Sequence, residues 1–224
     1  MRAYSILLLV FACWVSHSAT SKILTVESIN VHSFVSFDTI LVQIGEFEIL
    51  YSEELMQPLQ ATYTVTCPDP FVGECESSIG WRVSRAEELA GYEVLTSKPK
   101  HYKNNEWDRG HLIPVASVDC DCESKAVTYT YLNCALQHSG LNSDNKKPWT
   151  RLEEYERKIA KSSSGEVEVI VDVLFEPQAT PMCNGCPTIP SAFRKTIINE
   201  GDTLIYEFPN LDSGPADFSQ FRLR

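Results

Sequence analysis

The sequence predicts a single domain of the mixed α+β class. The chain has 224 residues, 43% of them hydrophobic and 22% charged, which is the composition of an ordinary globular protein. Several short runs rich in β-branched and aromatic residues indicate strands, and one stretch has the spacing of an amphipathic helix. The strands and helices do not alternate as β-α-β units, so we expect a mainly antiparallel arrangement.

The first 20 residues have the features of a secretory signal peptide. Arg2 precedes an apolar run, Ile6 to Val15, and small and polar residues follow. The run is shorter than the roughly 20 apolar residues that cross a bilayer, and no later stretch approaches that length. We therefore expect cleavage between Ser18 and Ser21 and a secreted domain of residues 21–224 without a membrane segment. The alternative is a signal anchor that stays attached.

The first half of the domain is expected to contain strands. Three candidate runs are "TILVQI" at 39–44, "FEILY" at 47–51 and "ATYTVT" at 61–66. A short helix is expected at 84–91, ended by Gly91, and a polar loop at 96–107 leads into the next segment.

The second half is expected to contain further strands. The candidates are "AVTYTYLN" at 126–133, "EVEVIVDVLF" at 166–175, "FRKTII" at 193–198 and "TLIYEF" at 203–208.

One helix is well defined between these strands. Pro148 suits a first helical position. A stripe with 3–4–3 spacing follows, formed by Trp149, Leu152, Glu156 and Ile159, and Glu153 lies on its shoulder.

The cysteines indicate disulfides, because the signal peptide directs the chain to an oxidising compartment. Without Cys13, seven cysteines remain, namely Cys67, Cys75, Cys120, Cys122, Cys134, Cys183 and Cys186. One of an odd number is left without an intrachain partner, and we expect this to be Cys134, because it ends an apolar run where a cysteine acts as a small buried hydrophobe. The sequence leaves the pairing of the other six open. The alternative is a four-cysteine zinc site built from "CDC" at 120–122 and "CNGC" at 183–186.

The formal net charge of −11 argues against a protein that coats nucleic acid through a basic surface. It does not exclude an enzyme with a local basic cleft. Basic residues gather at 98–109 and 146–158, and each cluster alone is equally well explained as a solvated face.

Asp108, Arg109, Gly110 and His111 place a carboxylate, a permanent cation, a permissive backbone and a titratable imidazole side by side. Such a cluster suggests proton transfer on an anion. The alternative is an Asp108–Arg109 ion pair beside an ordinary polar histidine.

The residues that follow favour the catalytic interpretation. Downstream of the "DRGH" tetrad come Asn133, Gln137, Leu141-Asn142, Trp149 and Leu152-Glu153. In this order they resemble the motifs of the DNA/RNA non-specific endonucleases, a ββα-metal group. The resemblance covers about residues 45–222, with "IPSAFRK" at 189–195 and "ADFSQFR" at 216–222 similar to later core strands of the family. It implies the ββα-metal nuclease fold, in which helices flank a central, mainly antiparallel sheet.

The chemistry of phosphodiester hydrolysis suits the same residues. His111 is the candidate general base, since an imidazole near its normal pKa accepts a proton at neutral pH. Asn142 offers a hard neutral oxygen to Mg²⁺, for which Mn²⁺ is a possible substitute, and Glu153 is placed to hold metal-bound waters.

Three further site residues are expected. Arg109 either binds a phosphate oxygen bidentately or pairs with Asp108. Asn133 is expected to orient the imidazole through its amide oxygen. The family has an upstream arginine that contacts phosphate, for which Arg82 is our choice and Arg85 the alternative. His101 and His138 are expected to be exposed loop histidines.

Together these expectations describe a secreted, Mg²⁺-dependent endonuclease that cuts DNA and RNA with little sequence specificity. It would bind its substrates through the phosphate backbone and leave 5′-phosphate ends. One alternative is a nuclease-fold binding or decoy protein without turnover, suggested by Leu132 where the family usually has serine. Another is a small extracellular module in which the tetrad is coincidental.

Overall fold

The computed structural model describes residues 23–24, 39–44, 47–69, 73, 80–81, 94–118, 120–143, 146–214 and 217–224. The signal peptide, the helix expected at 84–91, and Arg82 and Arg85 lie outside these residues. In the described part of the chain, no helix is long and apolar enough to cross a membrane.

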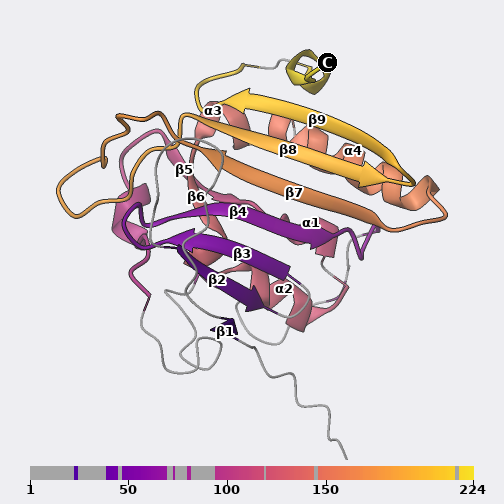
Figure 1. The fold of residues 1–224 in the computed structure, drawn as a ribbon, viewed down its shortest axis with the longest axis horizontal. Coiled ribbons are helices and arrows are strands. Elements are labelled where there is room, and N and C mark those ends of the chain that lie inside the picture. Colours follow the sequence, from indigo (N-terminus) through magenta and orange to yellow (C-terminus); the bar gives the residue numbers. More distant parts are fainter. Residues whose placement is uncertain are drawn as a thin grey trace, which may run out of the picture.

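A seven-stranded sheet forms the main layer of the molecule (Figure 1). Its strand order is β1-β2-β3-β4-β7-β8-β9, and every neighbouring pair is antiparallel. The strands are β1 (Ile23–Leu24), β2 (Thr39–Ile44), β3 (Phe47–Ser52), β4 (Gln57–Thr64), β7 (Val167–Leu174), β8 (Ala192–Asn199) and β9 (Asp202–Pro209).

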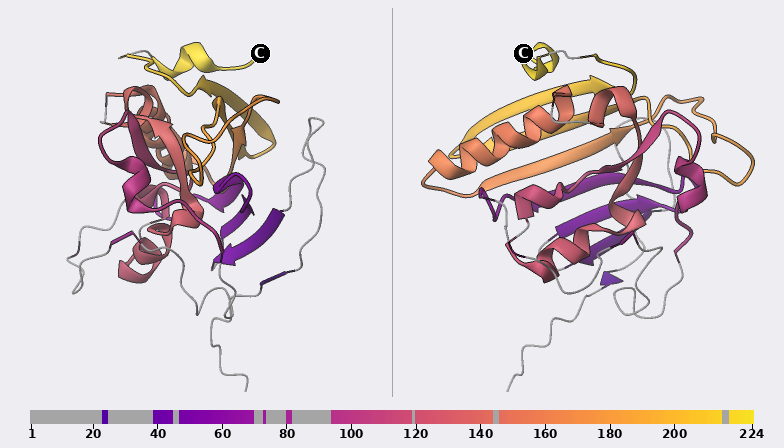
Figure 2. Two further views of the ribbon diagram at one scale, coloured as in Figure 1. Left: turned by 90° about the vertical axis from the view of Figure 1, so that its left-hand side faces the viewer. Right: turned by 180° about the vertical axis from the view of Figure 1, so that it is seen from behind.

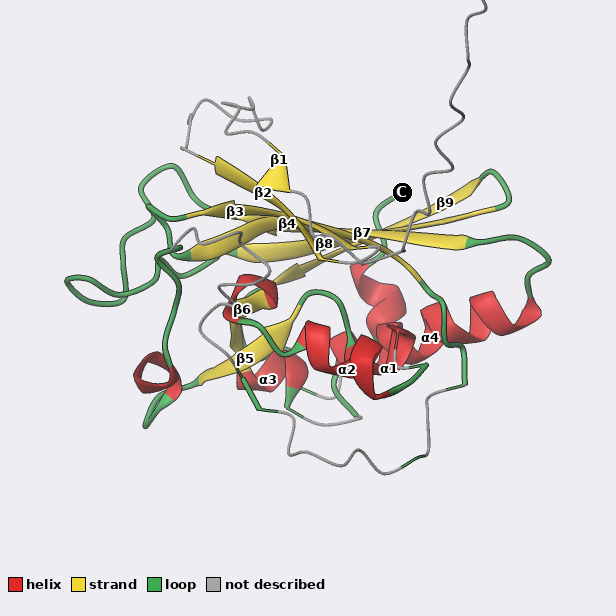
Figure 3. Cartoon of the chain, turned by 90° about the horizontal axis from the view of Figure 1, so that it is seen from below, coloured by secondary structure: helices red, strands yellow, loops and turns green. Residues whose placement is uncertain are grey.

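The second layer lies on one face of this sheet (Figures 2 and 3). It contains an antiparallel ribbon of β5 (Trp107–His111) and β6 (Cys134–His138) and the helices α1 (Val115–Val118), α2 (Cys122–Thr128), α3 (Ser139–Asn142) and α4 (Pro148–Ser162). Three 3₁₀ turns complete the described elements, namely η1 (Pro99–Tyr102), η2 (Tyr131–Asn133) and η3 (Phe218–Phe221). The expected α+β class with a mainly antiparallel sheet and flanking helices is confirmed.

The core lies between the two layers because each strand turns alternate residues inward. In β7 every second residue from Val167 is buried, and in β8 the inward positions are Phe193, Lys195 and Ile197. From the helical layer, Trp149 packs edge-on against Phe193, with ring centroids 5.6 Å apart. The apolar stripe predicted for α4 therefore faces the sheet.

The prediction of a strand at 126–133 is wrong. The chain forms α2 there, then η2, and the strand β6 begins only at Cys134. Asp121 starts α2 because its carboxylate accepts the backbone N–H groups of Glu123 and Ser124. This local cap outweighs the alternating pattern that suggested a strand. The core strand expected at 216–222 is also wrong in its described part, because Phe218–Phe221 form η3 and Arg222 then makes a single bridge to Tyr206 of β9.

The described cysteines other than Cys134 form disulfides and not a zinc site. Cys67 pairs with Cys120 and Cys183 with Cys186, and Cys122 is also disulfide-bonded. Within the described residues, no group of three or more His, Cys, Asp and Glu side chains gathers as a metal site. Cys134 is free and buried, as predicted.

Candidate active site

A pocket of about 450 Å³ opens in the helical layer, where the ends of several elements meet. The last residue of β5, the start of α1, the end of α3 and one face of α4 contribute to its wall. The lining residues are His111, Pro114, Val115, Ala116, Tyr129, Asn142, Ser143, Thr150, Glu153, Glu154 and Arg157.

Helix α4 faces the core with one side and the pocket with another. Its buried stripe includes Trp149, Leu152 and Glu156. The pocket-lining residues Thr150, Glu153, Glu154 and Arg157 follow at intervals of three, one and three, which places them on a neighbouring face. One helix thus anchors its own position in the core and presents two carboxylates and a guanidinium to the pocket.

The tetrad residues point in alternate directions because they form strand β5. Asp108 Oδ2 accepts a hydrogen bond of 2.5 Å from Ser143 Oγ, which ties the strand to the residue after α3. At Gly110 an added Cβ would collide with the buried side chain of Gln137, so the ribbon requires glycine there. His111 then comes to the pocket from the end of the strand.

His111 is enclosed by aromatic rings. Its ring centroid lies 4.4 Å from that of Trp81 and 5.0 Å from that of Tyr129, the latter edge-on. Within the described part of the chain its buried Nε2 has no hydrogen-bond partner. Burial, with a smaller contribution from the charge of Arg109, lowers the pKa of His111 to about 3. The expectation of a normal imidazole pKa is therefore wrong, and the ring is neutral at neutral pH.

Arg109 does not pair with Asp108. It is exposed, and its guanidinium lies over the ring of Trp81, 5.5 Å from the centroid. Strand periodicity puts it on the same face of β5 as His111. It does not line the pocket, but it is exposed on the side of the strand from which a polyanion would approach the histidine.

Asn133 does not orient the imidazole through its amide oxygen, contrary to our expectation. The side chain is buried, and Oδ1 accepts the backbone N–H of Ile113 at 2.9 Å. Its Nδ2 donates to the carbonyls of Ile113 and Thr128. Asn133 therefore fixes the backbone at Ile113, two residues after His111. It can affect the position of the histidine only through this backbone and makes no contact with the imidazole through its amide oxygen.

Asn142 and Glu153 line the pocket together, as the metal hypothesis requires. Both are half-buried and offer hard oxygen donors. At about 30 Å³ per water, the pocket has room for a Mg²⁺ ion that keeps most of its waters, so these residues fit the group. Asn142 would hold the ion, and Glu153 would accept hydrogen bonds from its waters.

The pKa of Glu153 is raised to about 7, chiefly by burial. The charges of Lys195 and Arg157 act in the opposite direction, while Glu156 raises the pKa further. The carboxylate therefore carries only part of a full charge at neutral pH when no cation is near it.

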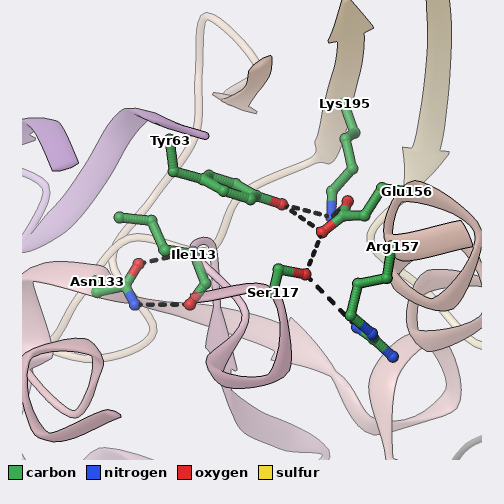
Figure 4. A network of polar contacts seen from close by, with 7 residues as sticks. All are labelled: Tyr63, Ile113, Ser117, Asn133, Glu156, Arg157 and Lys195. Carbon is green, nitrogen blue, oxygen red and sulfur yellow. Dashed lines mark hydrogen bonds and ion pairs between the residues drawn. The ribbon is translucent and has the colours of Figure 1, made fainter. Parts of the chain in front are cut away.

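Sequence reasoning missed a second group of residues behind the pocket wall (Figure 4). Lys195 and Glu156 form an ion pair of 3.0 Å with both side chains fully buried. Glu156 also accepts hydrogen bonds from Tyr63 and Ser117, and Ser117 accepts one from Arg157. A lysine at an inward position of the "FRKTII" strand, with a glutamate in the apolar stripe of α4, was the available signal.

The two other histidines among the described residues have structural contacts. His101 is buried, contrary to expectation, and its Nδ1 accepts the backbone N–H of Lys98 at 3.0 Å. His138 is half-buried and caps α3, because its Nδ1 accepts the N–H of Gly140 at 2.9 Å. Neither lines the pocket.

The antiparallel sheet, with the pocket beside β5 and α4, has the arrangement that the resemblance to the ββα-metal nucleases implied. The profile of the DNA/RNA non-specific endonuclease family matches residues 31–211. The chain belongs to this family, so it is a nuclease, a phosphodiester hydrolase whose substrates are nucleic acids.

A solved structure supports the same fold. The chain is similar to one described as "Crystal structure of the EndoG/EndoGI complex: Mechanism of EndoG inhibition", with a TM-score of 0.65 and 18% identity. The match covers 82% of this chain and 80% of the other. At this identity the likeness shows the fold alone. No curated protein sequence matches the chain.

Proposed function

We propose that the chain is a secreted, Mg²⁺-dependent endonuclease that cuts DNA and RNA without sequence preference and leaves 5′-phosphate ends. The observation that carries the proposal is the convergence of His111, Asn142 and Glu153, from three separate elements, on one pocket. Family membership supports the substrate class.

In this mechanism His111 is the general base. Its Nε2 has no hydrogen-bond partner among the described residues, and the neutral ring can accept the proton of the attacking water there. Trp81 and Tyr129 hold the ring from two sides, so that little freedom is lost when the water binds. An approaching phosphate anion also stabilises the imidazolium that forms, which raises the low pKa of His111 during the reaction.

The positive charge needed in the transition state comes from several groups. Arg157 lines the pocket and can donate to phosphate oxygens, and Arg109 extends the positive surface along β5. A magnesium ion bound at Asn142 would supply further charge stabilisation at the phosphoryl group. The Glu153 carboxylate accepts hydrogen bonds from water in the pocket and so keeps it oriented.

The proposed location is extracellular. Removal of residues 1–20 would leave residues 21–224 as one nuclease domain, and the family match over residues 31–211 is consistent with a single domain. The disulfides Cys67–Cys120 and Cys183–Cys186 support an oxidising compartment, since such bonds are rare in the cytosol.

The direct test is cleavage of a supercoiled plasmid and of a structureless RNA by the purified mature chain. We expect cleavage of both with Mg²⁺ and none with a chelator, and end-labelling should find phosphate on the 5′ ends. Binding of both polymers without Mg²⁺-stimulated cleavage would favour the decoy protein instead.

A further inference from the structure

A continuous series of polar contacts leads from the sheet to the pocket (Figure 4). On β8, Lys195 Nζ contacts Glu156 Oε2 at 3.0 Å. The other carboxylate oxygen, Oε1, accepts the hydroxyl of Tyr63 at 2.8 Å and that of Ser117 at 2.6 Å. Ser117 Oγ in turn accepts a hydrogen bond from Arg157 Nη1 at 3.5 Å.

The buried ion pair in this series calls for an explanation other than stability. Removing two charges from water is costly, and an apolar pair of similar volume often stabilises a protein as well or better. Lys195 and Glu156 nevertheless occupy positions that the strand and helix periodicities assign to the core. Their contacts therefore suggest a function at the pocket.

The chemistry of the groups gives the series a fixed direction. A carboxylate only accepts hydrogen bonds and a guanidinium only donates them, while a serine hydroxyl has one proton to give. Ser117 donates this proton in its hydrogen bond to Glu156. The lone pairs of Ser117 Oγ are then left to face Arg157.

The backbone holds Ser117 in place as well. Its carbonyl accepts the N–H groups of Thr66 and Cys67, both at 3.1 Å, and its own N–H donates to the carbonyl of Pro114 at 3.1 Å. Cys67 is further fixed by its disulfide to Cys120. Ser117 Oγ is thus a stationary acceptor beside a long and otherwise adaptable side chain.

We propose that Ser117 and Glu156 are positioning residues, which hold the Arg157 guanidinium at the pocket wall in readiness for a phosphate oxygen of the substrate. This inference rests on the proposed nuclease function. An arginine loses much rotamer freedom when it binds an anion, so a guanidinium that is already held binds phosphate at a smaller entropic cost. Lys195 acts one step further back, by holding Glu156.

The test is a double-mutant cycle of Ser117→Ala and Arg157→Ala. Ser117→Ala alone should lower kcat/KM about three- to tenfold, the range of an ordinary net hydrogen bond, because the Arg157–Ser117 contact is long at 3.5 Å. When Arg157 is already alanine, Ser117→Ala should have no further effect. Equal losses in both backgrounds would overturn the proposal, because a merely structural serine acts independently of Arg157.

A matched pair of core variants tests Glu156 without leaving a buried charge. In Glu156→Gln/Lys195→Met the amide oxygen still accepts from Tyr63 and Ser117, and the amide nitrogen faces an uncharged methionine. Glu156→Leu/Lys195→Met removes the acceptor. The leucine variant should lose as much kcat/KM as Ser117→Ala, and the glutamine variant should not. The comparison is made between variants of equal thermal stability. Loss of activity in both variants would assign the effect to charge and contradict the proposal. If the leucine variant does not fold, the comparison of Gln/Met with wild type and the Ser117 cycle still decide.

Binding separates this inference from the proposed function. The cycle is repeated in a His111→Ala background by anisotropy of a fluorescent DNA oligonucleotide with Mg²⁺ present. If wild type does not cleave but the chain binds, the proposed function fails while coupling between Ser117 and Arg157 still supports the positioning role. If Arg157→Ala leaves binding and cleavage unchanged, the positioning role is wrong whatever the enzyme does.

Discussion

At the scale of single residues, burial shifts the pKa values of two pocket residues, His111 and Glu153, in opposite directions for one reason. Low dielectric surroundings disfavour charge, so the pKa of His111 falls to about 3 and that of Glu153 rises to about 7. At neutral pH the empty pocket therefore carries less charge than its composition suggests. Arriving phosphate and cation would each restore a charged form.

His111→Ala should keep nucleic-acid binding and lose cleavage. The expected loss in kcat is about 10² to 10⁴-fold, as for other missing general bases, because the attacking water then has no proton acceptor. Added imidazole should restore a measurable part. The measurement is single-turnover cleavage, with circular dichroism as the control for folding. A variant that still cuts at half the wild-type rate would place the base elsewhere.

Asn142 and Glu153 are expected to differ in their response to Mg²⁺. Asn142→Ala should abolish metal-stimulated cleavage at every Mg²⁺ concentration, because it removes the direct ligand. Asn142→Asp should bind metal more tightly yet cut more slowly, since a neutralised cation stabilises the transition state less.

Glu153→Gln should keep reduced activity with a raised Mg²⁺ requirement, because it affects only waters around the ion. Magnesium titrations of the cleavage rate compare the three variants with wild type. The roles would be reversed if Glu153→Gln were inactive at all concentrations while excess Mg²⁺ restored Asn142→Ala.

The raised pKa of Glu153 predicts a pH-dependent stability. In the unfolded chain the carboxyl ionises near pH 4.5, and in the metal-free folded chain near pH 7. Between these values the unfolded chain holds fewer protons, so the free energy of unfolding should fall as pH rises from about 4.5 to 7 and then level off. The loss should be about 1–3 kcal/mol.

Urea denaturation at several pH values, in the presence of a chelator, measures this loss. Glu153→Gln cannot ionise and serves as the control, so its stability should lack this part of the pH dependence. Parallel curves for wild type and variant would show that Glu153 ionises normally.

At the scale of elements, strand β5 explains why the four tetrad residues occur together. Asp108 bonds to Ser143, Gly110 makes room for Gln137, and Arg109 and His111 share the opposite side of the strand. Each residue has its own surroundings, yet one short strand aligns them all. The order of the motif follows from the strand periodicity.

Gly110→Ala should destabilise the fold, because the new Cβ would lie 2.6 Å from Gln137 Cβ in a buried site. The expected cost is about 1–3 kcal/mol, the range for overpacked cores. Chemical denaturation measures it. Adding Gln137→Ala should recover part of the loss, and Gly165→Ala is a control, since its Cβ would meet nothing closer than 3.4 Å. A stable Gly110→Ala variant would mean that β5 and β6 can separate.

Elements with strong local signals could be predicted from the sequence. The alternation of β7 and the stripe of α4 both follow from burial on one side of the element, and both are confirmed. The pocket residues His111, Asn142 and Glu153 could be named from the motifs, although their roles stay predictions.

Features that depend on contacts distant in the sequence could not be predicted. The hydrogen bonds of Asn133 to the backbone of Ile113 and the series of contacts from Lys195 to Arg157 join residues from separate elements. No local sequence pattern shows which residue each of these side chains will contact. The low pKa of His111 also depends on enclosure by Trp81 and Tyr129, which lie 30 and 18 positions away. The run at 126–133 misled because its alternation imitates a strand while the cap by Asp121 starts a helix.

At the scale of the whole molecule, the sheet separates two surfaces of different use. The pocket lies in the layer of helices on one face, and exposed carboxylates such as Glu48 and Glu168 extend from strands whose neighbouring residues face the core. The chain as a whole has a net charge of −11 and repels a nucleic acid, although Arg109 and Arg157 attract its phosphates locally. Ionic strength decides which of these effects prevails.

We therefore expect the rate of cleavage at low substrate concentration to pass through a maximum as salt is added. At 0.01 M salt the Debye length is about 30 Å, so the whole negative charge opposes the approach of the substrate. Near 0.1 M it is about 10 Å, which screens the distant carboxylates more than the arginines in contact with phosphate. At higher salt, competition by cations for the phosphates weakens binding.

Neutralising carboxylates away from the pocket tests this explanation. The triple variant Glu48→Gln, Glu168→Gln and Asp202→Asn changes three exposed strand residues and reduces the net charge from −11 to −8. It should raise kcat/KM at 0.01 M salt and leave it unchanged at 0.15 M, where these charges are screened from the substrate. The measurement is the initial rate of cleavage of a labelled oligonucleotide at fixed Mg²⁺ over a series of salt concentrations. An equal gain of the triple variant at both concentrations would mean that these carboxylates act locally. If the wild-type rate instead falls steadily from the lowest salt concentration, attraction at the pocket outweighs the repulsion throughout.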